Sequence, residues 1–267
     1  MHLLRRLRPL YRTEPLADGA LVQRMRGHRL ESSIRLGPNE WHVAIIHADG
    51  TVDDLGISRN LLTTVGRDLL AAGFGNPAGK DGALTASSAT SATPAGGGMT
   101  VDAYKGWRVY APVTGLTTAP VYGNIGSNSA TVLTIDQWWT AADGVGATPA
   151  ATNGYHIQPA TIARFMALTE NAGAASAADT VLTGEITTGG LARAIATYAH
   201  TPGAATYTMT KSFSVTASFP AIHKGALFTA ANPTAAGVMV FEAVLNADAI
   251  VVNGDTLQIV ATNTLSG

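Results

Sequence analysis

Residues 206–219 alternate hydroxyl-bearing and mostly apolar side chains with a period of two. Every second residue from Thr206 to Ser218 is Thr or Ser. The positions between them are Tyr207, Met209, Lys211, Phe213, Val215, Ala217 and Phe219. Because successive side chains of a strand point to opposite faces, the segment predicts a strand with one apolar and one hydroxyl face. Such strands are typical of antiparallel sheets that bury one face.

The composition favours the same class of fold over the whole chain. Charged residues make up 13% of the 267 residues, against roughly 25% in ordinary globular domains. The chain contains 29 Gly, and Ala, Ser and Thr are abundant. This mixture favours short strands joined by turns over long helices with surface ion pairs. The length is sufficient for one large domain or two modest ones.

Charge is distributed unevenly along the chain. Residues 1–35 hold eight Arg and three acidic residues, a net charge of +5, and the remainder holds nine basic and fifteen acidic residues, a net charge of −6. A basic segment on an acidic body predicts that the segment docks onto something acidic. The acidic surface could belong to the same chain, to a second copy or to another partner, and the sequence leaves these alternatives open.

The first 39 residues are interpreted as a basic anchoring arm. Three leucines follow a helical spacing, and arginines lie among and after them, while Pro9 limits any helix to a short one. The residues expected to dock are Leu3, Leu4, Leu7, Arg5, Arg6, Arg8 and Arg12. The apolar stripe is too short to favour a membrane surface. The leucines favour a protein groove over packaged nucleic acid, to which arginines would bind through phosphates alone.

Residues 40–75 and 156–267 are predicted to form one β-sandwich domain. Strands are expected at 41–47 and 51–57, around a turn at Asp49-Gly50. A helix is expected from Asn60, as its cap, to Gly75, because five apolar residues there recur at helical spacing. Further strands are expected at 162–168, 191–199, 205–217, 221–228, 237–246 and 255–263. Short strands at this spacing are typical of a sandwich.

Residues 76–155 are predicted to be a small β domain inserted into the sandwich. Two Gly- and Ala-rich stretches, 76–100 and 141–154, are interpreted as linkers. Between them, strands are expected at 106–113, 119–124 and 131–139. The fold class is therefore mainly β, with an antiparallel sandwich, one short helix, this insertion and the arm.

Aromatic residues concentrate in the insertion and are the candidates for surface recognition. They include Trp107, Tyr122, Trp138 and Trp139. On an exposed sheet they would stack on sugar rings, such as a host-surface glycan, or anchor a protein interface. The alternative is that a small domain uses them as its core.

No pattern in the chain indicates catalysis, a metal site or a cofactor site. Cys is absent, which removes disulfides and thiolate metal ligands. His42 and His47 are five residues apart on one strand and face opposite sides. Asp248, Asn253 and Asp255 offer oxygen ligands without the spacing of a calcium loop. A glycosidase would need two carboxylates across a cleft, and the sequence nominates no such pair. The expectation is a protein that is not an enzyme.

A succession of short segments resembles the β-sandwich domain of virion appendage proteins of tailed bacteriophages. The segments are RNLLTTVGRDLL (59–70), FMALTE (165–170), TVLTGEI (180–186), GLARA (190–194), GALFTA (225–230), VMVF (238–241) and GDTL (254–257). Within the insertion, YKGWRV (104–109) and TVLTID (131–136) resemble a small module that recurs in phage structural proteins. The resemblance covers a little under half of the chain.

The resemblance implies a non-enzymatic structural role in the virion, as a head-fibre, capsid decoration or minor tail protein. It implies other virion proteins as partners and a homo-oligomeric contact, with synthesis in the cytoplasm of the bacterial host. The alternative function is an adhesion module of the tail that binds a host receptor or carbohydrate. The sequence does not distinguish the head from the tail.

Overall fold

The structure is a computed structural model that describes residues 11–15, 21–25, 35–36, 40–75, 79–113, 120–159, 163–231 and 237–266. These residues form eighteen strands and one helix. All strand pairs named between them are antiparallel. The prediction of a mainly β, antiparallel fold is therefore confirmed.

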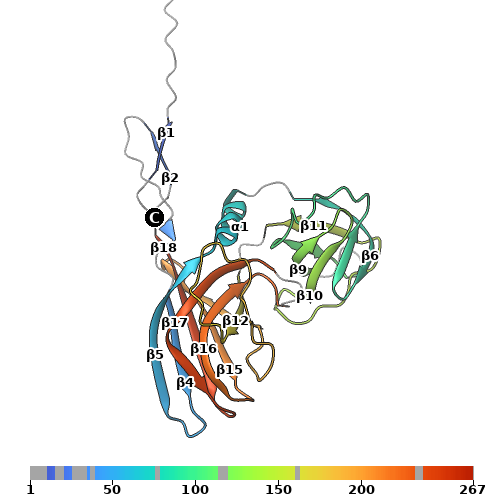
Figure 1. Ribbon diagram of the computed structural model, residues 1–267. Helices are drawn as coiled ribbons and strands as arrows, with labels where there is room; N and C mark the ends of the chain where they lie inside the picture. Colours follow the sequence, from blue (N-terminus) through green and yellow to red (C-terminus); the bar gives the residue numbers. More distant parts are fainter. Residues whose placement is uncertain are drawn as a thin grey trace, which may run out of the picture.

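Ten strands form one large sheet (Figure 1). Their order is β13-β12-β16-β17-β5-β4-β18-β15-β14, and β3 pairs with β18. In chain order they are β3 (Arg35–Leu36), β4 (Glu40–Ile46), β5 (Val52–Leu62), β12 (Phe165–Thr169), β13 (Ala194–Ile195), β14 (Thr197–His200), β15 (Thr206–Ser214), β16 (Phe219–Phe228), β17 (Met239–Val251) and β18 (Thr256–Ser266). We call this part of the molecule the sheet body.

The large sheet folds over on itself along β5. Residues 52–59 of β5 pair with β4, whereas residues 60–62 pair with β17. One core therefore collects buried side chains from both halves of the sheet, among them Trp41 of β4, Phe213 of β15 and Leu168 of β12. The sequence predicted a sandwich, and the observed arrangement is a single sheet whose two halves share this core.

The period-two pattern of residues 206–219 matches the burial of β15 and the residues after it. Met209, Phe213 and Val215 are buried, whereas Ser212 and Ser214 are exposed. β15 pairs with β14 on one side and with β18 on the other. The hydroxyl face is therefore the outer face of this half of the sheet, and the apolar face contributes to the core.

The helix α1 (Thr64–Gly75) begins three residues later than the sequence predicted. Asn60 and Leu62 lie in β5, opposite Ala243 and Phe241 of β17, so Asn60 is not the cap. The cap is Thr63, whose Oγ1 accepts a hydrogen bond of 3.0 Å from the backbone N–H of Gly66. Pairing with β17 satisfies the backbone of residues 60–62 and overrides their helical apolar spacing.

The insertion is a closed six-stranded barrel with its own core. Its strands are β6 (Asp81–Ser88), β7 (Ser91–Pro94), β8 (Arg108–Ala111), β9 (Val121–Asn128), β10 (Leu133–Trp139) and β11 (Gly154–Gln158), in the order β10-β7-β6-β11-β8-β9. The prediction of a linker over 76–100 was wrong, because β6 and β7 lie there. β11 carries the barrel to Gln158, three residues past the predicted boundary.

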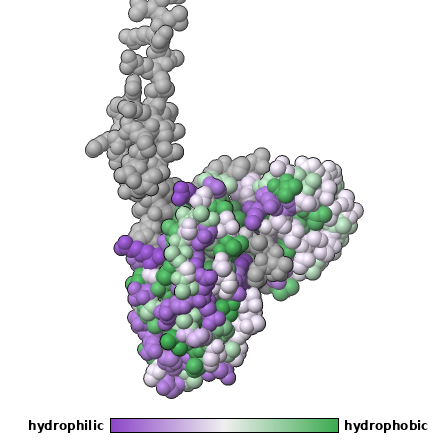
Figure 2. Space-filling model, in the orientation of Figure 1, coloured by the Kyte–Doolittle hydropathy of each residue, from purple (hydrophilic) through white to green (hydrophobic). Residues whose placement is uncertain are grey.

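Two barrel strands, β6 and β7, were not predicted because they consist mostly of small residues. β6 reads Asp-Gly-Ala-Leu-Thr-Ala-Ser-Ser, and only Leu84 is a large apolar residue. Closing the barrel gives this strand two neighbours, β7 and β11, so its backbone is paired without a strong apolar pattern. Figure 2 agrees, because the barrel surface is largely pale, whereas purple and green residues are interspersed over the sheet body.

Near the N-terminus, β1 (Tyr11–Pro15) and β2 (Leu21–Met25) pair as a two-stranded sheet. Arg12 lies in β1, opposite Arg24. The other predicted docking residues, Leu3, Leu4, Leu7, Arg5, Arg6 and Arg8, lie outside the described residues. β3 pairs with Leu265 and Ser266 at the end of β18. Within the described part of the chain, no helix is long and apolar enough to cross a membrane.

The contact between the two halves of the sheet allows a direct test. A Cβ added to Gly225 of β16 would lie 2.4 Å from Cζ3 of Trp41, which is fully buried. We expect Gly225→Ala to lower the free energy of unfolding by about 1–3 kcal/mol, because the ring has no room to move. Chemical denaturation measures this change. In the control Gly154→Ala, where the nearest atom is 3.8 Å away, a comparable loss would contradict the explanation.

Candidate functional site

The barrel and the sheet body meet through a shared apolar cluster. Tyr122 and Trp139 of the barrel pack in one buried group with Phe165, Phe228 and Met239 of the sheet body. The ring centroids of Trp139 and Phe165 are 5.5 Å apart. The insertion is therefore fixed against the large sheet by core packing as well as by the chain connections.

A buried carboxylate, that of Asp136 on β10, ties this junction together. Asp136 is 5% exposed. Its Oδ1 accepts from the backbone N–H groups of Asn124 and Gln137, and its Oδ2 accepts from Asn124 Nδ2, Trp139 Nε1 and the backbone N–H of Ala231. Ala231 follows β16, so one side chain of the barrel holds a backbone group of the sheet body. These five hydrogen bonds offset the cost of burying the carboxylate.

A second polar chain crosses the same junction. Arg108 places its guanidinium carbon 4.2 Å from the centroid of the Tyr122 ring, and its Nε donates to Asn124 Oδ1. The Tyr122 hydroxyl donates to Asp143 at 2.7 Å, and Asp143 pairs with Arg164 at 2.6 Å. Burial and the bond to Asp143 raise the pKa of the Tyr122 phenol. Arg164 directly precedes β12, so this chain also connects the barrel to the sheet.

The aromatic residues predicted for surface recognition lie mostly in these cores. Trp138 is 1% exposed, Trp139 is 7% exposed and Tyr122 is 5% exposed. Trp138 fills the barrel and donates its Nε1–H to the backbone oxygen of Ser88. A barrel built largely from small residues needs such side chains to fill its interior. Because these three side chains are buried, their ring faces are not accessible for stacking on a sugar.

Trp107, the remaining aromatic candidate, is half-buried beside a cavity of about 260 Å³. It packs edge-on against Tyr104, with centroids 5.4 Å apart. The cavity lies between α1, the barrel and the segment after β16, and is lined by Val65, Asp68, Leu69, Ala72, Lys105, Trp107, Thr180, Gly237 and Val238. Its volume is below the roughly 300–1,000 Å³ of small-molecule sites.

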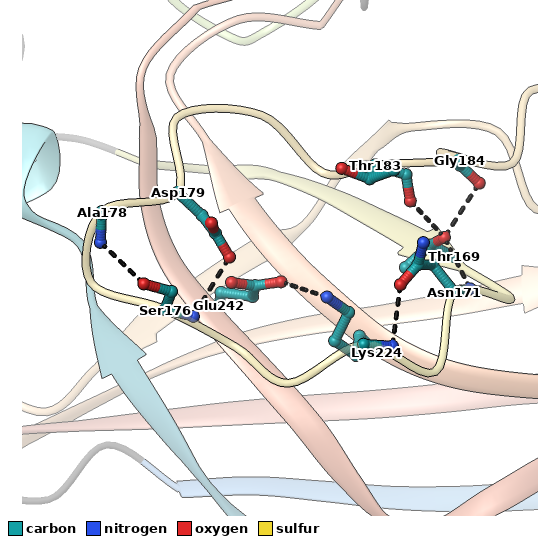
Figure 3. A network of polar contacts seen from close by, with 10 residues as sticks. Thr169, Asn171, Ser176, Ala178, Asp179, Thr183, Gly184, Lys224 and Glu242 are labelled. Carbon is teal, nitrogen blue, oxygen red and sulfur yellow. Dashed lines mark hydrogen bonds and ion pairs between the residues drawn. The ribbon is translucent and has the colours of Figure 1, made fainter.

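A buried ion pair lies on the sheet body (Figure 3). Lys224 Nζ of β16 is 2.8 Å from Glu242 Oε1 of β17, and the two side chains are 4% and 1% exposed. The side chain of Asp179, from the loop after β12, points toward Glu242 (Figure 3). Burial raises the pKa of Glu242, the ammonium of Lys224 opposes this, and Asp179 raises it further.

The sequence contained a signal for these buried charges that pattern reading missed. Glu242 stands in the run Val-Met-Val-Phe-Glu-Ala-Val-Leu. Asp136 follows Ile135 and precedes Gln137, which is followed by two tryptophans. An ionisable residue within an apolar strand is costly unless it is paired. Each position therefore marks a polar partner elsewhere in the chain, although the sequence does not say which one.

Four described histidines pair with aspartates: His42 with Asp54, His47 with the exposed Asp53 and the buried Asp255, His156 with Asp81, and His223 with Asp248. Two of the oxygen ligands considered for calcium, Asp248 and Asp255, are therefore engaged with histidines. In the part of the chain that the structure describes, no group of three or more His, Asp or Glu side chains is arranged to hold a metal ion.

Comparisons with family models, curated proteins and solved structures gave no significant match to this chain. The candidate site therefore rests on geometry alone. The geometry indicates a joint between two β bodies, with a small cavity beside it and a separate buried ion pair.

The junction predicts a specific sensitivity to Asp136→Asn. In one orientation of the amide, its NH₂ group faces the two N–H groups that now bond to Oδ1, and in the other it faces the three that now bond to Oδ2. We expect a loss of about 3 kcal/mol in the free energy of unfolding, since buried donors lose their acceptor. Calorimetry measures the loss. Asp68→Asn, on the exposed face of α1, is the matched control, and equal effects of the two substitutions would rule out the junction as the cause.

The pairs of His47 predict a pH dependence of stability. The bond to Asp53, followed by that to Asp255, raises the pKa of His47 above its ordinary value of 6.5. The stabilisation is therefore fully present below pH 6.5 and is lost as the pH rises through the raised pKa. Between about pH 5.5 and about pH 8, the midpoint of unfolding should fall less steeply with rising pH in His47→Gln than in the unchanged protein.

The control for this pH dependence is His200→Gln, because the His200 ring bonds to the backbone oxygen of Thr206. This variant should retain the pH dependence of the unchanged protein. An unchanged slope in His47→Gln would show that the His47 pairs do not contribute.

Proposed function

We propose that this chain is a non-enzymatic structural protein of a tailed-bacteriophage virion. It docks through its basic N-terminal arm and exposes the sheet body and barrel on the particle as a capsid decoration, head-fibre or minor tail protein. The observation that carries the proposal is the separation of charge. Residues 1–35 have a net charge of +5 and the remainder has a net charge of −6.

Of the arm, β3 pairs with the end of β18. Among the residues whose burial is described, the members of the main core lie between Trp41 and Ala261, and those of the barrel core lie between Leu84 and Ile157. A body with its own cores is able to fold before docking. The arm is then free to supply contacts to a partner, and attachment through many copies would offset the entropy of ordering it.

The topology supports a body that projects from its anchor. β3 pairs with the end of β18, so the chain enters the sheet body from the arm at that end (Figure 1). β4 then runs the length of β18, from Glu40 opposite Thr262 to Ile46 opposite Thr256. The turn after β4 therefore lies at the opposite end of the sheet, away from the arm.

The homo-oligomeric contact of this proposal rests on exposed apolar residues of the body. Ile57 and Leu61 of β5 and Val244 of the neighbouring β17 are large apolar residues that are 56%, 37% and 44% exposed. Apolar residues on two adjacent strands are suited to a contact with a second copy. We assign the homo-oligomer contact of this proposal to these strands.

The alternative of an adhesion module that binds a carbohydrate depended on the aromatic residues of the insertion. Trp138, Trp139 and Tyr122 are buried, and this removes the support they gave to it. We therefore propose no second function.

The anchoring role predicts the behaviour of a chain that lacks residues 1–15. We expect this truncation to abolish incorporation into phage particles while leaving the unfolding transition of the body unchanged. Immunoblots of purified particles and denaturation of the purified protein measure the two effects. Replacing Arg5, Arg6, Arg8 and Arg12 by Gln should reproduce the loss of incorporation. Normal incorporation of either variant would contradict the anchor.

The matched control is Arg67→Gln, which removes an arginine from the exposed face of α1 and should incorporate normally. Immunogold electron microscopy with an antibody to the barrel distinguishes the possible locations. Gold over the head would indicate decoration or a head fibre, and gold at the tail would indicate a minor tail protein. Particles without any gold would contradict a role in the virion.

A further inference from the structure

The Lys224–Glu242 pair brings an amine and a carboxyl group together where water is nearly excluded. Nζ lies 2.8 Å from Oε1, an oxygen bonded to Cδ of Glu242. The side chains are 4% and 1% exposed. The second carboxylate oxygen, Oε2, is buried and has no hydrogen-bond donor among the described residues. An ordinary buried ion pair would satisfy both oxygens of the acid.

Asp179 lies on the side of Glu242 that faces away from Lys224 (Figure 3). Two ionised carboxylates are acceptors only, so a hydrogen bond between Glu242 and Asp179 requires a proton on one of them. Burial and Asp179 both raise the pKa of Glu242, which favours the protonated acid. A protonated carboxyl group is an electrophile for an amine, whereas a carboxylate is not.

The loop that carries Asp179 is fixed in place (Figure 3). Asp179 Oδ2 accepts from the backbone N–H of Ser176 at 3.1 Å, and the backbone N–H of Asp179 donates to the Ser176 oxygen at 3.0 Å. The backbone oxygen of Ala177 accepts from the N–H of Thr64, at the start of α1. The acid is therefore held against Glu242 from a separate element. Asp179 is itself partly exposed, which leaves a way out for a released water molecule.

We propose that Lys224 and Glu242 condense into an amide that cross-links β16 and β17, with Asp179 as the proton carrier. Two reactive groups held in contact by the fold react as if at very high concentration, with effective molarities of about 10⁵ M or more in favourable cases. Exclusion of water opposes the reverse reaction. The cross-link is independent of the proposed function, because it requires only the folded chain.

The reaction balances without a cofactor or a change of oxidation state. Asp179 takes a proton from the Lys224 ammonium, and the neutral Nζ attacks Cδ of the protonated Glu242. The N–C bond forms, and the tetrahedral centre then collapses with cleavage of one C–O bond. Asp179 returns a proton to the leaving hydroxyl, which departs as water, and the second N–H proton passes to solvent through Asp179. The products are a neutral amide, one water molecule and one proton released to solvent, and Asp179 ends as it began.

Intact-protein mass spectrometry of the purified full chain tests the proposal. The measured mass should be lower than the sequence mass by one water molecule. Trypsin should no longer cleave after Lys224. Because no Lys or Arg follows Lys224, residues 212–267 should then appear as one internally cross-linked peptide whose mass is lower by one water molecule. A measured mass equal to the sequence mass would overturn the proposal and identify the contact as an ion pair.

Variants assign the reacting atoms. Lys224→Arg and Glu242→Ala should each restore the full mass, while Glu242→Gln should lose the mass of ammonia in place of water. Asp179→Ala should form the cross-link at least tenfold more slowly. The matched control Lys211→Arg, on β15, should keep the mass deficit. A deficit that persists in Lys224→Arg would place the lost water elsewhere and overturn the assignment.

Refolding separates the proposal from a variant that merely fails to fold. Chain purified in denaturant directly after synthesis should have the full mass, and the deficit should appear only after the denaturant is removed. This measurement uses the unchanged sequence. Loss of water in the denatured chain, or no loss after refolding, would contradict a reaction that depends on the folded site.

Discussion

The two pairings of β5 determine most of the remaining architecture. Residues 52–59 bind β4 and residues 60–62 bind β17, so the sheet must fold over between them. The same pairing sets Thr63 at the end of the strand, where it caps α1. It also places Leu61 opposite Glu242, so the position of the buried ion pair depends on the register of these three residues. A slip by one residue would reverse the faces of all three.

The two buried acids illustrate opposite uses of a charge in a low-dielectric environment. Asp136 accepts five hydrogen bonds from the barrel and from Ala231 of the sheet body, so its cost of desolvation is offset and it acts as a structural tie. Glu242 has one partner for Oε1 and only another acid near Oε2. An acid that is fully satisfied is inert, whereas one that is left unsatisfied is poised for protonation and chemistry.

The sequence predicted the fold where a local pattern coincided with tertiary burial. The alternation around Phe213 and the turn at Asp49-Gly50 are local, and both appear in the structure. The predicted start of α1 was wrong because Asn60 and Leu62 pair with β17, which lies about 180 residues away in the chain. β6 was missed because barrel closure, and not an apolar face, pairs its backbone. Non-local pairing leaves no trace in a window of a few residues.

The same reasoning explains the candidate site. The types of Asp136, Lys224 and Glu242 are visible in the sequence, but their partners come from distant elements, and only the folded chain joins Asp179 to Glu242. The tryptophans were candidates for surface recognition and lie mostly in the cores, because composition does not distinguish a barrel core from a binding face.

If the body projects from an anchor beside β3, pulling forces enter the sheet at the end of β18. β16 and β17 lie beyond β4 and β5 from that point. A bond between them would therefore strengthen the half of the sheet that also holds the barrel, because Phe228, at the end of β16, and Ala231, which follows this strand, both contact the barrel.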